Sequence, residues 1–285
     1  MGVVYMLLAS ASFVTMSALI KALGSSIPLS QQVFLRCLLA TPVLFAILVH
    51  RGQPLLVQAK KLLLVRSLFG MTAMHGFFYA LTHMPLADAV FISRSQPLII
   101  ALLSPLVLGE SAPKSAWLAV GCGLCGVALI MRPAMAWPEA AWVALGAAFC
   151  AATAQMLVRR LNRTDRPLVI VFNFTLFTAL ATGMVALPGF VAMSGRQWLL
   201  IAGVAIFASG GQLLMTQAYR RDRAPVISAA GYSSILLSVL YGTLFWQEVV
   251  QPLTWAGAAL IVGSGILLVR SRIGVAEPAA RITTL

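Results

Sequence analysis

Charged residues are scarce in this chain, and acidic residues are the scarcest. Of 285 residues only 9% are charged and only 7 are Asp or Glu, whereas soluble domains carry roughly 25% charged residues. Hydrophobic residues make up 60%, and the mean hydropathy is +0.94. This composition excludes an ordinary soluble protein and indicates a chain that lies largely within a membrane.

Motifs for catalysis and for metal binding are also lacking. The sequence contains no HExxH, GxSxG or Walker motif, so it predicts neither an enzyme nor a pump that hydrolyses ATP by itself. Cys122 and Cys125 form a CxxC pair, but no second pair or neighbouring histidines complete a metal site. We interpret them as small packing residues in a membrane helix, and no metal or cofactor is expected.

Long apolar runs fill most of the sequence. A membrane-spanning helix needs about 20 apolar residues, and runs of this kind are far longer than the alternating strands of a membrane barrel. The expected fold is therefore an all-α integral membrane protein with ten transmembrane helices. We place these helices at 3–23, 33–50, 62–82, 87–108, 115–131, 140–158, 168–187, 197–218, 225–245 and 253–270.

The two halves of the sequence match when residue numbers are shifted by 138. Glu110 then falls on Glu248 and Trp117 on Trp255, without a gap. Such a repeat indicates a duplicated architecture. Because each half holds five predicted helices, an odd number, the halves enter the bilayer in opposite orientations, as in many secondary transporters. We expect inverted repeats at 1–133 and 139–271 and a short cytoplasmic tail at 272–285.

Basic residues gather on one side of the predicted membrane. The opposite side holds only Lys21, Arg132 and Arg196. The richer side has Arg51, Lys60, Lys61, Arg66, Lys114, Arg159, Arg160, Arg163, Arg166, Arg220, Arg221, Arg223, Arg270, Arg272 and Arg281. This asymmetry places both termini in the cytoplasm. The loops are too short for a nucleic-acid-binding face, so the expected partners are a small-molecule substrate and the lipid bilayer, and no obligate protein partner is evident.

Polar side chains within predicted helices indicate a transport path, because each is costly in lipid unless it lines a cavity or finds a partner. The path is expected between the segments 62–82, 87–108, 197–218 and 225–245, with 3–23 and 140–158 alongside. The predicted substrate-contacting residues are His75, Phe78, Tyr79, Arg94, Gln96, Gln155, Gln212, Thr216 and Tyr232.

Arg94 is the main candidate for binding a substrate carboxylate, because arginine pairs with carboxylates through two parallel hydrogen bonds. The alternatives are a salt bridge to Asp88 or a side chain that reaches the external surface. His75 is interpreted either as a substrate contact or pH-sensitive gate, or as a hydrogen-bonded packing residue. Arg36 is interpreted as an interfacial anchor or a partner of Asp88 rather than as a ligand.

Pro97 is predicted to break the helix at 87–108 beside Arg94, since proline supplies no N–H and clashes with the preceding turn. The exposed carbonyls would face the path; the alternative is an ordinary membrane-helix proline whose neighbours compensate. The equivalent residue in the second half is Ile235. We therefore expect no second kink there, with Gly231 providing flexibility instead.

Glu110 and Glu248 each precede a tryptophan by seven residues. We interpret the two glutamates as caps of the helix that follows each of them, and Trp117 and Trp255 as interfacial anchors. The alternative for the glutamates is a role in proton coupling.

These residues resemble the paired signature of EamA-type carriers in the drug/metabolite transporter superfamily, and the chain as a whole is most similar to the YddG-type amino-acid exporters. The signature residues are Leu108-Gly109-Glu110, Trp117, Gly121 and Gly126, then Trp246-Gln247-Glu248, Trp255, Gly257 and Gly263. Gln247 departs from the pattern, because glycine precedes the glutamate in the first half.

The resemblance implies a bacterial inner-membrane carrier with a central cavity, exporting amino acids, aromatic ones among them, or related metabolites by alternating access. The alternatives are a drug or sugar/nucleotide-type carrier, a membrane-embedded enzyme and a passive channel.

Overall fold

The computed structural model describes residues 2–96, 98–100, 102–103, 114–131, 139–161, 164–221 and 230–273, and within these ranges the regular structure is entirely helical. The elements are α1 (Gly2–Leu23), the short 3₁₀ helix η1 (Gly24–Ser26), α2 (Leu29–His50), α3 (Lys60–His83), α4 (Leu86–Ser93), α6 (Lys114–Met131), α7 (Glu139–Leu161), α8 (Pro167–Ala186), α9 (Gly195–Arg221), α11 (Ser233–Trp246) and α12 (Pro252–Ile273).

The helix positions follow the apolar runs of the sequence, and prolines mark several starts. α8 and α12 begin at Pro167 and Pro252, while α2 and α4 begin directly after Pro28 and Pro85. Proline suits this position because the first N–H groups of a helix have no partner within it. Within the described residues, six helices are long and apolar enough to cross a membrane, and three shorter apolar helices accompany them.

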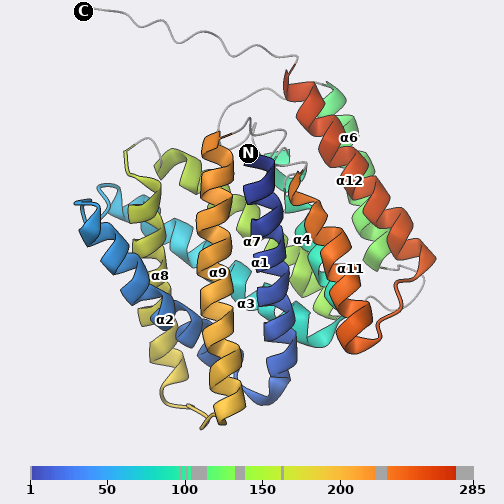
Figure 1. The fold of residues 1–285 in the computed structure, drawn as a ribbon. Coiled ribbons are helices and arrows are strands. Elements are labelled where there is room, and N and C mark those ends of the chain that lie inside the picture. The colour runs from blue at the N-terminus through green and yellow to red at the C-terminus, as the bar shows by residue number, and fades with distance from the viewer. Residues whose placement is uncertain are drawn as a thin grey trace, which may run out of the picture.

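The helices form a bundle with one pair set at its side. α1 packs along α9, α3 along α7 and α2 along α8, while α6 and α12 pack on each other beside the bundle (Figure 1). Gly126 and Gly257 make the α6–α12 contact close, since a Cβ on either would lie within 2.6 Å of the other's carbonyl oxygen. Small residues at a helix interface allow this close approach in membrane proteins.

The helix at 87–108 is interrupted earlier than the sequence predicts. α4 ends at Ser93, and Arg94 and Ser95 form a turn before helical residues resume. The Ser95 hydroxyl donates to the carbonyl of Ile92 at 2.7 Å, a side-chain bond that competes with the helical ladder. Pro97 itself, the predicted cause of the break, lies outside the described residues.

A matching break occurs in the second half, so the expectation of no second kink is wrong. Tyr232, the repeat equivalent of Arg94, lies in a turn between helical residues 230–231 and α11. Ser234 donates to the carbonyl of Gly231 at 3.0 Å. A serine hydroxyl therefore satisfies a carbonyl at both breaks, and the second one forms although Ile235 replaces the proline.

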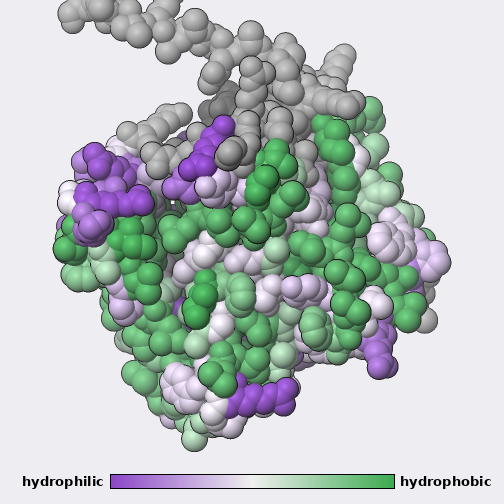
Figure 2. Space-filling view, in the orientation of Figure 1, coloured by the Kyte–Doolittle hydropathy of each residue, from purple (hydrophilic) through white to green (hydrophobic). Residues whose placement is uncertain are grey.

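The surface is that of a protein in lipid. Large apolar side chains are widely exposed, among them Val249 at 88%, Met184 at 79% and Leu199 at 77%. Figure 2 shows hydrophobic residues over most of the visible face, with hydrophilic ones gathered toward its upper left and lower edge. Trp117 and Trp255 are 46% and 44% exposed, as interfacial anchors would be. An apolar surface of this extent is typical of a membrane-spanning bundle.

Candidate functional site

The bundle has two chemically different ends. One carries the end of α1, the connection from α3 to α4 and the residues between α11 and α12; we call it the Lys21 end. The other carries the end of α2, the start of α3 and the start of α8; we call it the Arg51 end. Polar contacts close the first, and a cavity reaches the second.

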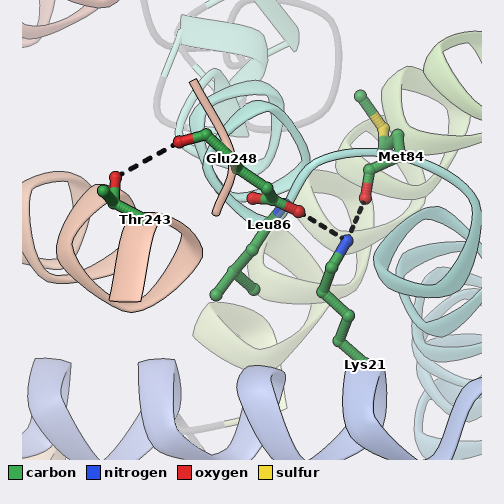
Figure 3. Close-up of polar contacts among 5 residues, drawn as sticks. All are labelled: Lys21, Met84, Leu86, Thr243 and Glu248. Atoms are coloured by element: carbon green, nitrogen blue, oxygen red, sulfur yellow. Dashed lines mark hydrogen bonds and ion pairs between the residues drawn. The ribbon is translucent and has the colours of Figure 1, made fainter. Parts of the chain in front are cut away.

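Lys21 and Glu248 form an ion pair at the Lys21 end, with Nζ 2.8 Å from Oε1 and both side chains nearly buried, 13% and 14% exposed. Lys21 also donates to the carbonyl of Met84 at 2.7 Å. Figure 3 shows Lys21 reaching between these two acceptors, so that α1, the α3–α4 connection and the segment after α11 are tied together. The contact joins parts of the sequence that are 63 and more residues apart.

Glu248 caps a different helix from the predicted one. Its Oε2 accepts a hydrogen bond of 2.9 Å from the backbone N–H of Leu86, the first residue of α4. The sequence interpretation assigned Glu248 to the following helix, α12, and this is wrong: its carboxylate folds back over Gly242 toward the other half of the chain. A carboxylate at the start of α4 is favourable because the helix dipole is positive there. Its repeat equivalent, Glu110, lies outside the described residues.

A second contact closes the Lys21 end on the side of α2. Gln31 is buried near the start of α2, donates from Nε2 to the carbonyl of Val191 at 2.8 Å and accepts from the Val191 N–H at 2.9 Å. This paired amide contact joins α2 to the α8–α9 connection. The contacts at Glu248 and at Gln31 thus seal two sides of the same end.

A cavity of about 490 Å³ reaches the Arg51 end. Residues of α2, α3, α8 and α9 line it, and its wall extends from Arg36 and Met74 within the bundle to Arg51, Gln53 and Arg166 at the helix ends. Small-molecule sites typically have volumes of roughly 300–1,000 Å³. The cavity is therefore large enough for a metabolite. It reaches the Arg51 end of the bundle, whereas polar contacts close the Lys21 end.

Four arginines line the cavity, namely Arg36, Arg51, Arg66 and Arg166, and none of the described residues lining it is acidic. Arg66, in the second turn of α3, places its guanidinium carbon 3.6 Å from the centre of the Phe174 ring of α8. Its Nε and Nη1 atoms are buried and have no hydrogen-bond partner among the described residues. Arg36 donates from Nη1 to the sulfur of Met74 at 2.8 Å. The cavity is thus strongly cationic.

Three repeat-related pairs contribute both members to the cavity wall. They are Arg36 with Phe174, Cys37 with Thr175, and Met74 with Gln212. The residue numbers in each pair differ by 138, but the side chains differ in chemistry: a cation corresponds to an aromatic ring, a thiol to a hydroxyl, and a thioether to an amide. The cavity therefore lies where the halves meet, and its two sides are chemically unlike.

The predicted site residues do not all meet at this cavity. Gln212 lines it. Arg94 lies elsewhere, beside Gly231 and next to Tyr232. Its Nη1 is 3.8 Å from the point that a Cβ would occupy if Gly231 carried one. Tyr232 packs its hydroxyl against Gly265 of α12. The structure thus brings Arg94, Gly231 and Tyr232 together at the two helix breaks, apart from the described cavity.

The remaining predicted contacts are scattered. Phe78 is 1% exposed within the core, Tyr79 stacks on His83 with ring centres 4.0 Å apart, and His75 Nδ1 lies 2.9 Å from the carbonyl of Met71. Gln96 is half-buried and Gln155 is exposed. The side chain of Thr216 lies outside the described part of the structure. Their role in substrate binding stays a prediction.

Arg36 and Arg66 are the cavity residues that the sequence interpretation missed. Arg36 was assigned to an interface, and Arg66 was counted among the loop charges although it lies inside the segment predicted as a helix at 62–82. The missed signal was a permanently charged side chain within a predicted span, which is costly unless it faces a cavity or partner. No group of three metal-ligating side chains occurs within the described residues.

A helical bundle with a membrane-type surface and an arginine-lined internal cavity is an arrangement that suits a membrane transporter. The EamA-like transporter family model matches the chain twice, at residues 1–132 and 139–270, and the chain belongs to this family. The second match begins 138 residues after the first, the same shift that aligns the two halves.

Several curated proteins are similar over most of the chain. The pseudopaline exporter CntI of Pseudomonas aeruginosa (strain UCBPP-PA14) is 32% identical over 280 residues, covering 96% of this chain and 97% of that protein. An uncharacterized transporter of Helicobacter pylori (strain ATCC 700392 / 26695) is 27% identical, covering 94% of each. A riboflavin transporter of Rhizobium johnstonii is 25% identical over 73% of this chain and 70% of its own length. These relatives are transporters, in agreement with a chain that is not an enzyme.

The fold is also that of a solved crystal structure. It aligns with a TM-score of 0.67 at 22% identity and covers 95% of this chain and 99% of its own. A likeness at this identity supports the arrangement of helices and carries no statement on substrate.

Proposed function

We propose that this protein is a secondary transporter that exports amino acids or related small metabolites through the cavity between its halves. One observation carries the proposal: the two ends of the bundle differ. An arginine-lined cavity reaches the Arg51 end, and the Lys21–Glu248 ion pair closes the other end. A substrate can enter such a bundle from one side only, which is one of the two states that alternating access requires.

The other state follows from the proposed inverted repeat. α1 packs on α9, and α3 packs on α7. Under the shift of 138 residues α1 corresponds to α7 and α3 to α9, so each of these pairs corresponds to the other. α6 and α12 are repeat equivalents, and the end of α6 near Gly126 contacts the start of α12 near Gly257, so they run antiparallel. Both features support ten helices in two inverted halves. Exchange of the two halves' conformations would open the Lys21 end and close the Arg51 end.

The orientation in the membrane follows from the basic residues. Arg51, Lys60, Lys61 and Arg166 are all at or near the Arg51 end. The positive-inside rule assigns that end to the cytoplasm. The cavity would then face the cytoplasm of a bacterial inner membrane, as an exporter loading its substrate requires.

The relatives widen the range of substrates. One is named as an exporter of pseudopaline and another as a transporter of riboflavin. An amino-acid substrate of the YddG type is therefore one proposal within a family that carries several small metabolites. Arg94 keeps its proposed role near the helix breaks, where it would act when the halves rearrange rather than in the cavity described.

Transport by the purified protein tests this proposal. Proteoliposomes would be incubated with a ¹³C-labelled mixture of the twenty amino acids together with citrate and riboflavin, and their contents measured by mass spectrometry. Saturable uptake of at least one compound above protein-free liposomes is the expected result. Non-saturating uptake would indicate a passive channel, and a new product formed in detergent solution would indicate an enzyme. Uptake equal to that of empty liposomes for every compound would refute the proposal.

A further inference from the structure

We infer that the cavity binds an anion with at least two carboxylates, one held by Arg66 and the other by Arg36. The inference deepens the proposed transport function and rests on it for the statement that this anion is carried. It names a substrate class by the chemistry of two guanidinium groups that share one cavity.

Arg66 carries a positive charge in a cavity whose described lining includes no acidic residue. Arginine stays protonated in proteins, and two of its buried nitrogens, Nε and Nη1, have no acceptor among the described residues. The ring of Phe174 supports the guanidinium from one side at 3.6 Å but accepts no conventional hydrogen bond from its edge. An unsatisfied buried charge is costly. A carboxylate in the cavity beside this guanidinium would form charge-assisted contacts with it and offset part of that cost.

Arg36 is similarly poorly satisfied, at a second position in the cavity. Its Nη1 donates to the thioether of Met74, which is a weak acceptor. Its guanidinium carbon also lies 6.0 Å from the centre of the Phe78 ring. Neither contact neutralises the charge. A carboxylate would be a far stronger acceptor for the same nitrogen.

The spacing of the two groups follows from α3. Arg66, Gly70 and Met74 are four residues apart in succession, so they lie on one face of the helix. At 1.5 Å per residue, Arg66 and Met74 are about 12 Å apart along the axis, and Arg36 contacts Met74. Gly70 lets the Phe174 ring and Arg66 lie close to the helix, because a Cβ there would lie 2.9 Å from the ring and 3.3 Å from Arg66 Nη1.

The rest of the cavity favours the same class. Arg51 and Arg166 add positive charge where the wall reaches the helix ends. A cleft lined by one sign of charge concentrates ligands of the opposite sign. A compound with one carboxylate leaves a guanidinium unsatisfied, whereas a compound with two or more satisfies both. Analogues of the same shape in which an amide replaces one of the two carboxylates are expected to bind weakly.

Binding to the full chain in detergent tests the inference. Dissociation constants would be measured by thermal shift and calorimetry for aspartate, glutamate and citrate, with asparagine and glutamine as counterparts in which an amide replaces the side-chain carboxylate. We expect at least one of the acids to bind at least tenfold more tightly than the amides. Arg66→Gln and Arg36→Gln should each weaken that binding about tenfold to a hundredfold, the cost of a charge-assisted hydrogen bond. Lys61→Gln, which removes an exposed charge from the same helix, should change it less than twofold.

A second readout separates binding from folding. Arg66→Gln should leave the melting temperature of the ligand-free protein unchanged or raise it, since a buried charge without an anion is removed. A clear drop in that temperature would show a structural role and overturn the assignment of Arg66. Amides that bind as tightly as the acids, no acid binding, or unchanged binding in both variants would also overturn the inference.

The outcomes also separate this inference from the proposed function. If a neutral compound is transported in proteoliposomes while none of the acids binds, the inference fails and the transport function stands. If an acid binds through Arg36 and Arg66 but no compound crosses the bilayer, the binding site stands and the transport function fails.

Discussion

Lys21 Nζ lies 2.8 Å from Glu248 Oε1, and this pair joins the end of α1 to the segment after α11. The same carboxylate accepts the N–H of Leu86 at the start of α4. One glutamate thus holds together helices from both halves at the end opposite the cavity. The proposed opening of this end during transport would have to break these contacts.

Charge removal at this pair is expected to loosen the Lys21 end. Lys21→Gln and Glu248→Gln should each lower stability, and the double variant should recover part of the loss, giving a coupling energy of about 1–2 kcal/mol for a nearly buried pair. Thermal unfolding in detergent measures it. Arg196→Gln, at an exposed position on the same end, is the matched control. Additive losses in the double variant would show that the pair is not coupled.

Gln247 is expected to be a strained position that glycine would relieve. It follows α11 with φ of 53°, a left-handed conformation that costs a non-glycine residue roughly 1 kcal/mol. The equivalent residue in the first half is Gly109. Gln247→Gly should raise the unfolding free energy by about 0.5–1 kcal/mol, and Gln247→Ala should not. A glycine variant less stable than the alanine variant would contradict this explanation.

Gly70 is expected to be needed for the stacking of Arg66 on Phe174. Gly70→Ala would push a methyl group against that ring and so weaken acid binding several-fold. Gly146→Ala in α7 is the control, because no neighbouring atom lies within 4 Å of its added Cβ. The control should be neutral or slightly stabilising, since alanine favours helix by about 1 kcal/mol over glycine. Equal binding by the two variants would show that the cavity tolerates the displacement.

Tyr79 is expected to become accessible from the Lys21 end in the other state. Its repeat equivalent, Gln217, lines the present cavity, as does Leu213, the equivalent of His75. A cysteine at position 79, in a chain without its four native cysteines, should react with a membrane-impermeant thiol reagent added on the Lys21 side. Glu248→Gln should increase that reaction.

A cysteine at position 217 provides the complementary measurement for this exchange. It should react from the Arg51 side, and Glu248→Gln should slow it, because the two accessibilities belong to alternative states. A position 79 that stays unreactive in both backgrounds would contradict an exchange of the two halves.

The helices could be predicted from the sequence because hydrophobic length and proline positions determine where membrane helices begin and end. The predicted segment 140–158 corresponds to Glu139–Leu161, and 197–218 to Gly195–Arg221. The close approach of α6 and α12 was predictable for a similar reason, since glycines remove the side chains that keep helices apart.

The site was predictable only in part, because burial of a polar residue does not reveal which face of a helix carries it. Gln212 lines the cavity wall, whereas Arg94 lies at the helix breaks. Arg66 was treated as a loop charge because it lies near a helix start, and only packing shows that it turns inward onto Phe174. Glu248 acts on α4, a long-range contact that no local capping rule anticipates.

Counterflow in proteoliposomes tests the central claim most directly. Vesicles containing the protein would be loaded with a high concentration of the acid that binds best, and the same compound, isotopically labelled, would be added outside at low concentration. Alternating access through the cavity predicts a transient accumulation of label inside above its equilibrium level, which Arg36→Gln abolishes and Lys61→Gln preserves. Label that never exceeds its level in protein-free vesicles, or an accumulation unchanged by Arg36→Gln, would contradict the account.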